Sequence, residues 1–245
     1  MIPSITFQKD EFIHKYLLPI SKVADNVSLF TNEEGVYTVC SSQNGSSTVL
    51  YSQYKTSLMS GVKRINIPDI KKFIRLLDCI ECESVTLEFH NNHLRFNNDC
   101  IKFNYFLYED SAMPRCNINP DKIKKITYDT SFTLATSKYN EILKGSSIAT
   151  DSDKLYIHTK DGNVYAELND HERQNINNIC YLMSESYSGG DITSPISLGL
   201  ENLRLLAGLK TNTFSVGVNK DLKLVCFEYK DGLAEAKFLI SGLVK

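Results

Sequence analysis

Two pairs of metal-binding residue types lie close together in the chain. Cys79 and Cys82 form a Cys-x-x-Cys pair, and His90 and His93 form a His-x-x-His pair. Cysteine thiolates and imidazoles at such spacings are typical zinc ligands. The residues between the two pairs have the pattern of a complete strand, which would carry the histidines well away from the cysteines. The simpler interpretation is buried thiols and a turn with solvent-facing imidazoles, so we expect no metal or other cofactor.

Other patterns that carry chemistry are weak or missing from the sequence. It contains no G-x-G-x-x-G, Walker or G-x-S-x-G motif. Asp151 and Asp153 lie in a polar turn that lacks the ligand count of a calcium loop. Cys40, Cys180 and Cys226 lie in expected strands and are most simply small core residues. The five histidines and the scattered carboxylates form no catalytic triad by spacing, so nothing indicates an enzyme.

One short stretch, 67–77, combines an apolar and a cationic face. Its apolar residues fall at i, i+3, i+4 and i+7, which is one stripe of an α-helix, and they are Ile70, Phe73, Ile74 and Leu77. The opposite face carries Lys71, Lys72 and Arg75. Pro68 suits the first helical position and Asp69 the first turn. The cations of this helix face either water or a polyanion.

The helix belongs to a repeating order of elements. The order strand, helix, three strands occurs four times, with helices expected to start near residues 9, 68, 137 and 200. Pro19 predicts that the first helix kinks or ends near Leu18. Ser137 is a plausible N-cap of the third helix, which Gly145 ends, and the fourth is expected over 200–209. Antiparallel strands with one helix per unit indicate an α+β fold.

The strands that the patterns predict are short and separated by turn residues. They are expected at 4–7, 27–31, 36–41, 48–55, 62–67, 85–90, 93–97, 100–108, 126–135, 155–159, 164–168, 179–187, 192–199, 214–218, 222–229 and 234–241.

Length and composition allow one large domain or two small ones, since 42% of the 245 residues are apolar. Segment 109–125 holds two prolines and no periodicity, so we interpret it as a linker. We expect an N-terminal domain at 1–109, a connector at 110–125 and a C-terminal domain at 126–245. No cationic leader and no apolar run of the ~20 residues that span a bilayer is present, and seven cysteines then favour reduced thiols in the cytoplasm.

Charge is distributed unevenly between the helices and the rest of the chain. The segments 9–22, 68–78, 137–144 and 200–210 hold ten basic and six acidic residues, a net charge of +4. The remainder carries −6, and the whole chain −2. This distribution suggests that the helices share a face that meets phosphate. The alternative is that Lys and Arg collect on any exposed helix because they are good helix formers.

The fourfold unit, the two halves, the connector and the basic helices together resemble a DNA sliding clamp. The resemblance is closest to the two-domain, trimeric clamps of tailed bacteriophages and more distant to proliferating cell nuclear antigen. It covers the whole chain at the level of element order and is clearest at 155–168, 198–208 and 237–245. It implies the DNA-clamp fold, in which three copies close head to tail and twelve helices line a bore inside a continuous outer sheet.

The resemblance also implies a function. The protein would encircle duplex DNA, tether the replicative DNA polymerase and be loaded by an ATP-driven clamp loader, without catalysis, in the host-cell cytoplasm if it is phage-encoded. The expected DNA-facing residues are Lys15, Lys22, Lys71, Lys72, Arg75, Lys138, Lys144, Arg204 and Lys210. Partner peptides would dock near the connector and the C-terminal tail, which suggests Met113, Pro114, Ile118, Leu243 and Val244 as pocket residues. Ordinary packing of the linker is the alternative for these five.

A ring needs unpaired strand edges at both ends of each subunit. By position these are strands 100–108 and 179–187, and the expected interface residues are Phe103, Tyr105, Leu107, Cys180, Leu182 and Ser184. Two other functions remain open: a monomeric DNA-binding processivity or single-strand-binding module, and an enzyme on a repeated α+β scaffold, which predicts a deep pocket with convergent ionisable groups.

Overall fold

The structure, a computed structural model, describes residues 2–42, 48–56, 62–113, 116–149, 152–173 and 177–243. In the first half of the chain, the elements are β1 (Ser4–Gln8), α1 (Lys9–Glu11), η1 (Phe12–Leu17), α2 (Leu18–Val23), β2 (Val27–Asn32), β3 (Gly35–Ser41), β4 (Thr48–Lys55), β5 (Arg64–Ile67), α3 (Ile70–Asp78), β6 (Ser84–His90), β7 (His93–Asn97), β8 (Lys102–Phe106), η2 (Asp110–Ala112) and α4 (Pro120–Lys124). In the second half, they are β9 (Thr130–Ala135), α5 (Thr136–Gly145), β10 (Lys154–Lys160), β11 (Asn163–Leu168), β12 (Ile179–Ser184), β13 (Ser188–Gly189), β14 (Ile196–Gly199), α6 (Leu200–Arg204), β15 (Thr213–Asn219), β16 (Leu224–Asp231) and β17 (Ala234–Ser241). The fourfold order of strand, helix and three strands is confirmed, with the two-residue β13 as an addition.

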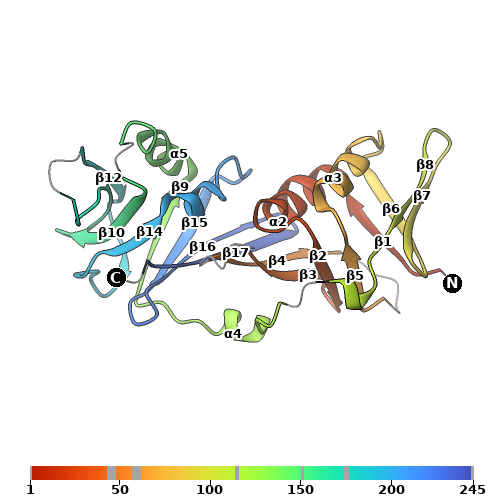
Figure 1. The fold of residues 1–245 in the computed structure, drawn as a ribbon, viewed down its shortest axis with the longest axis horizontal. Helices are drawn as coiled ribbons and strands as arrows, with labels where there is room; N and C mark the ends of the chain where they lie inside the picture. Colours follow the sequence, from red (N-terminus) through yellow and green to blue (C-terminus); the bar gives the residue numbers. More distant parts are fainter. Residues whose placement is uncertain are drawn as a thin grey trace. The chain divides into compact units, whose positions relative to one another are not determined.

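The chain divides into two compact units. Unit 1 comprises residues 1–44, 49–123 and 230–236, and unit 2 comprises 45–48, 124–229 and 237–245. In unit 1, the antiparallel strands β1, β6, β7 and β8 form one sheet in that order, and β5, β2, β3 and β4 follow one another in a second. Helices α2 and α3 lie side by side over these strands (Figure 1).

Aromatic side chains fill the core of unit 1 between the first helix and the strands. The ring centroid of Phe12 lies 4.1 Å from that of Phe7, 5.2 Å from that of Tyr16 and 5.0 Å from that of Tyr54. All four side chains are buried. Ring pairs at these separations contribute about 0.5–1.5 kcal/mol beyond the apolar area that they bury, so the cluster fixes the first helix on the sheet.

The first helix runs through Pro19 to Val23, so of the two expectations, a kink or an end near Leu18, the end is wrong. At Leu18 the helix instead changes from π-helical to α-helical geometry. Between Phe12 and Leu17 the chain makes a π-helical turn, in which the N–H of Leu18 donates to the carbonyl of Ile13. A π-helical turn contains one residue more than an α-helical turn. The α-helical segment α2 follows it, and Pro19 is the second residue of this segment. There a missing N–H costs nothing, because the first N–H groups of a helix have no intrahelical partner.

Unit 2 is built in the same way with a different core. Strands β12, β11, β10 and β14 form one sheet, and β13, β9, β15, β16 and β17 follow one another in another. The ring centroid of Tyr139 on α5 lies 5.6 Å from that of Phe214 and 6.0 Å from that of Phe227. The Tyr139 hydroxyl donates to the carbonyl of Leu203, which ties α5 to α6.

Several predicted helix ends differ from the structure. Helix α3 begins at Ile70, because Asp69 serves as its N-cap and accepts the N–H of Lys72 at 2.8 Å. Helix α5 begins at Thr136 without a side-chain cap, so Ser137 is not its N-cap. Instead, the Thr136 N–H donates to the carbonyl of Asn212 at 2.9 Å. Helix α6 is shorter than expected, since the residues after Arg204 continue in turns with i→i+3 hydrogen bonds.

Other differences concern strands, the linker and the thiols. The connector contains two short helical turns, η2 and α4, and β9 starts only at Thr130. Cys40 and Cys226 are buried as expected, but Cys180 is exposed on β12. The described helices include none with the length and apolar character of a membrane span.

The Cys79/Cys82 and His90/His93 pairs do not come together in the structure, and the two thiols are exposed, so the interpretation of these thiols as buried is wrong. The thiol of Cys79 donates to the carbonyl of Arg75, 3.3 Å away, and the rings of His90 and His93 stack across the β6–β7 hairpin. Among the described residues, no group of three or more His, Cys, Asp or Glu side chains is arranged to hold a metal ion. All seven cysteines are unpaired.

Candidate nucleic-acid and partner interface

Helix α3 turns its apolar side into unit 1 and its cations outward, as its sequence predicts. Ile70, Phe73 and Leu77 are buried. On the other side, Lys71 forms an ion pair with Asp25 at 2.8 Å, in which both side chains are more than half exposed. Exposed pairs of this kind contribute at most about 1 kcal/mol and are screened by salt. Lys72 and Arg75 are exposed and have no ion-pair partner among the described residues.

The cations of the first helix are less available than its sequence suggests. Lys15 lies 2.8 Å from Asp231 and 3.8 Å from Glu11, so two carboxylates neutralise it. Lys22 is half-buried, and this loss of hydration lowers the pKa of its ammonium group. The first helix therefore contributes less free positive charge than α3.

In unit 2 the predicted cations lie on or beside two helices that the Tyr139 hydroxyl bond joins. Lys138 forms an i,i+3 ion pair with Glu141 at 3.0 Å on the exposed side of α5. Lys144, Arg204 and Lys210 are exposed and have no ion-pair partner among the residues that the structure describes. Lys144 lies in the last turn of α5, where a cation also complements the helix dipole.

Both strands that were predicted as subunit edges lie at the end of a sheet. Strand β8 is the last of the order β1-β6-β7-β8, and β12 the first of the order β12-β11-β10-β14. Along the described part of the chain, each therefore has one side without a strand partner. An unpaired strand presents a row of N–H and C=O groups that another strand can pair with.

The side chains on these edges divide differently from the prediction. Tyr105 is buried, its ring packs 4.9 Å from that of Phe73, and its hydroxyl donates to the carbonyl of Asp69 at 2.7 Å. Burial raises the pKa of Tyr105 to about 12. Phe103 stacks on Phe96 with centroids 5.6 Å apart. Tyr105 therefore belongs to the subunit's own core, whereas Phe103 is partly exposed beside Phe96.

Sequence reasoning missed Phe106, the exposed large apolar side chain of β8. It is 61% exposed, and its ring centroid lies 5.6 Å from that of His93 on the next strand. Leu182 on β12 is 37% exposed and Cys180 is also exposed, while Ser184 is only partly so. The alternation of side chains along a strand could have identified Phe106, because it lies on the face opposite Tyr105.

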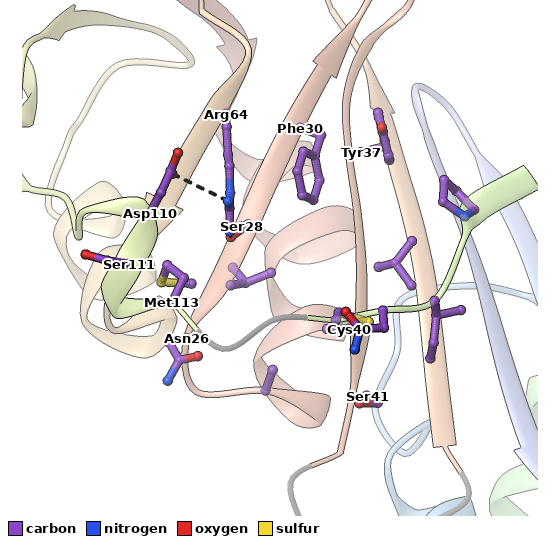
Figure 2. Close-up of a pocket in the computed structure, with 17 residues that line it drawn as sticks. Asn26, Ser28, Phe30, Tyr37, Cys40, Ser41, Arg64, Asp110, Ser111 and Met113 are labelled. Atoms are coloured by element: carbon purple, nitrogen blue, oxygen red, sulfur yellow. Dashed lines mark hydrogen bonds and ion pairs between the residues drawn. The ribbon is translucent and has the colours of Figure 1, made fainter.

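A cavity of about 830 Å³ lies in unit 1 between the connector and strands β2, β3 and β5 (Figure 2). We call this cavity the connector groove. Of the five predicted pocket residues, Met113 and Ile118 line it, together with Cys40 from β3. Burial raises the pKa of the Cys40 thiol, with a smaller contribution from Cys116, so Cys40 acts as a small apolar residue of the wall.

The remaining predicted pocket residues are elsewhere or not described. Leu243 lies in unit 2, where its N–H donates to the carbonyl of Ser197 at 2.8 Å. Pro114 and Val244 lie outside the described residues. Sequence reasoning missed the polar wall of the groove, where Ser28 and Arg64 are found, because its residues come from separate strands.

Comparisons with known proteins give a fold. No family model and no curated protein sequence matches the chain. A structure of the C-terminal region of FEN-1 bound to A. fulgidus PCNA matches over 100% of this chain and 99% of the other, with a TM-score of 0.78 and 12% identity. Proliferating cell nuclear antigen from Entamoeba histolytica matches over 100% of both chains, with a TM-score of 0.79 and 12% identity.

The PCNA2–PCNA3 complex from Sulfolobus tokodaii matches over 98% of both chains, with a TM-score of 0.71 and 14% identity. At such low identity the likeness concerns the fold. Over its whole length, this chain has the DNA-clamp fold of proliferating cell nuclear antigen.

Proposed function

We propose that this protein is a sliding clamp, which encircles duplex DNA and tethers the replicative DNA polymerase without catalysing a reaction. The observation that carries this proposal is the whole-length likeness to PCNA structures, with TM-scores of 0.71–0.79. The exposed cations of α3, α5 and the α6 region add independent support, because a ring that slides needs a weakly cationic surface and no base-reading contacts. In this proposal residues 1–109 and 126–245 are the two clamp domains, and 110–125 connects them.

The ring in this proposal is a homotrimer that closes by pairing β8 of one copy with β12 of the next. Two unpaired edges on one chain favour a head-to-tail interface, which closes into a ring when the rotation fits. Phe106 and Leu182 are the exposed apolar residues of these edges. Their burial would favour association, while backbone hydrogen bonds would extend the sheet from copy to copy.

Partner proteins in this proposal dock through short peptides in the connector groove. Its volume falls within the range of ligand sites, and Met113 and Ile118 give it an apolar lining. One matched structure holds the C-terminal region of FEN-1 bound to PCNA. By analogy we infer that this chain binds a DNA polymerase and an ATP-driven clamp loader in the same manner. The resemblance to phage clamps further suggests viral DNA replication in the cytoplasm of a host cell.

The deciding experiment measures mass and topology together. Native mass spectrometry over a series of concentrations should show three times the 27.7 kDa of one chain. After loading, the clamp should stay on closed circular DNA and be lost when a restriction enzyme linearises it, because a ring slides off free ends. A monomer that binds linear DNA with a steep salt dependence would contradict the proposal and support the monomeric alternative.

A further inference from the structure

The guanidinium group of Arg64 places a positive charge in the wall of the connector groove. Its Nη2 donates to the Ser28 hydroxyl at 2.8 Å, and its Nη1 lies 3.5 Å from Oδ1 of Asp110 (Figure 2). Its Nε is buried and has no hydrogen-bond partner among the described residues. A buried guanidinium N–H without an acceptor is unfavourable, since it has lost its water without replacing it. Arg64 therefore has donor capacity that the described residues leave unused.

An aromatic and apolar wall begins next to this cation. The guanidinium carbon of Arg64 lies 5.4 Å from the ring centroid of Phe30, which stacks with Tyr37 at 5.6 Å. All three residues line the groove, as do Met113 and Ile118. Among the described lining residues, Arg64 and Asp110 are the charged ones. Within the described lining, the groove thus places one cation beside a group of aromatic and apolar side chains.

Asp110 holds Arg64 only loosely. Its side chain is 74% exposed, and it lies in the turn η2 at the start of the connector. It also accepts a hydrogen bond from the Asn66 amide at 2.7 Å, so it keeps a partner if Arg64 is taken from it. An exposed carboxylate at 3.5 Å contributes little stability. Exchanging it for another carboxylate therefore costs little free energy.

We propose that Asp110 stands in the place of a partner's carboxylate, and that the connector groove selects peptides with an aspartate or glutamate side chain beside their apolar residues. The incoming carboxylate would pair with the Arg64 guanidinium, and the adjacent apolar side chains would cover Phe30 and Met113. This inference rests on the proposed function, which assigns partner peptides to the groove. It adds the charge that those peptides carry and the residue that reads it.

The test begins with a random peptide library selected on the intact protein. We expect the selected peptides to share an Asp or Glu at a fixed position relative to an apolar residue. The best of them is then synthesised with an amidated C-terminus and a fluorescent label, together with its Asp→Asn or Glu→Gln counterpart. Neutralising the peptide should weaken binding to the wild-type protein roughly tenfold or more, the usual effect of losing a hydrogen bond to a charged group.

Protein variants assign this effect to Arg64. Arg64→Gln should weaken binding of the acidic peptide as much as neutralising the peptide does. Combining the two changes should reduce the affinity no further than either change alone. Lys63→Gln removes an exposed charge from the neighbouring residue and should leave affinity unchanged. Thermal unfolding verifies that Arg64→Gln is folded. If it is not, Arg64→Lys keeps the charge, loses the planar fork and should still weaken binding.

The role of Asp110 has its own variant and control. Asp110→Asn removes the internal competitor, so the acidic peptide should bind several-fold more tightly. The affinity of the neutral peptide should stay unchanged. Asp121→Asn removes the same charge from an exposed connector residue that does not line the groove, and it should change neither affinity. Unchanged binding in Asp110→Asn would overturn the competitor role.

The outcomes separate this inference from the proposed function. Peptides that lose binding with Met113→Lys but are insensitive to Arg64→Gln would show a docking groove without the acidic requirement, which overturns the inference alone. Peptides that require a free C-terminal carboxylate would likewise overturn the assignment of a side chain. If no selected peptide responds to Met113→Lys, both the inference and the groove's part in the proposed function fail. The trimeric ring would still be tested separately, by the mass measurement.

Discussion

The two compact units reach the same order of elements with differently built helix surfaces. In unit 1 the helix cations without an ion-pair partner among the described residues, Lys72 and Arg75, lie on the capped helix α3, while nearby carboxylates neutralise Lys15. In the described part of unit 2 the corresponding cations are spread over α5, α6 and the turn after it. The cores also differ, with a Phe12-centred cluster in unit 1 and a Tyr139-centred one in unit 2. A fold of this kind thus constrains the element order more tightly than the residues that carry each surface.

The largest expected effects concern the two cores. Phe12→Ala and Phe214→Ala should each lower the free energy of unfolding by about 3–5 kcal/mol, because each leaves a cavity in a closed aromatic cluster. Chemical denaturation measures the loss, and Phe12→Leu is a milder control. Hydrogen exchange shows which elements lose stability in each variant. Phe12→Ala should reduce the protection of backbone amides in α2 and α3, and Phe214→Ala that of backbone amides in β9 and β15. Equal deprotection of both units by either variant would contradict the assignment of each aromatic cluster to the stability of its own unit.

The next effect concerns the unlike edges of the two units. Phe106→Asp and Leu182→Asp should each convert the trimer to a monomer, since a charge would be buried in the proposed interface. Both side chains are exposed in the single chain, so the monomer should remain folded. A mixture of the two variants retains one intact pair of edges and should form heterodimers. Native mass spectrometry distinguishes these species, and a persistent trimer in both variants would rule out these edges.

A smaller effect separates the cationic surfaces. Neutralising Lys71, Lys72 and Arg75 in unit 1, or Lys144, Arg204 and Lys210 in unit 2, should weaken binding to duplex DNA. For every cation removed that pairs with a phosphate, the slope of log affinity against log salt concentration should become shallower by about 0.9. Fluorescence anisotropy over a series of salt concentrations measures both the affinity and this slope.

The control for this comparison removes the same charge elsewhere. Lys55, Lys63 and Lys122 are exposed in unit 1 but lie outside its long helices, and their neutralisation should leave the salt dependence nearly unchanged. If the control weakens binding as much as the α3 triple variant, net charge rather than the helix surface governs the affinity. If only one helix set matters, the two units do not share the DNA surface equally.

The smallest effect concerns the helix starts. Asp69→Ala should cost about 1 kcal/mol of stability, because the N–H of Lys72 loses its acceptor. Ser137→Ala in α5 should change stability by less than about 0.5 kcal/mol, since Ser137 caps nothing. Paired denaturation curves measure the difference. Equal losses in the two variants would mean that the Asp69 hydrogen bond contributes no stability of its own.

Local patterns in the sequence were enough for the order of elements and for the amphipathic helix α3. Apolar spacing depends only on neighbouring residues, so Ile70, Phe73 and Leu77 could be assigned to one buried stripe before any fold was known. Helix ends were less predictable. Proline and serine are common residue types at helix boundaries, which is why Pro19 and Ser137 were interpreted in that way. Here the first helix continues past Pro19 after a π-helical turn, and the N–H of Thr136 at the start of α5 donates to the backbone carbonyl of Asn212.

The tertiary structure alone decided which charges are free and which residues meet. Lys15 is neutralised by Asp231, which lies 216 residues further along the chain. The connector groove brings Arg64 to Asp110 and Phe30 from three separate segments, and no spacing in the sequence indicates that meeting. The periodicity of a segment indicates which of its own side chains share a face, whereas the pairing of distant charges depends on the folded path of the whole chain.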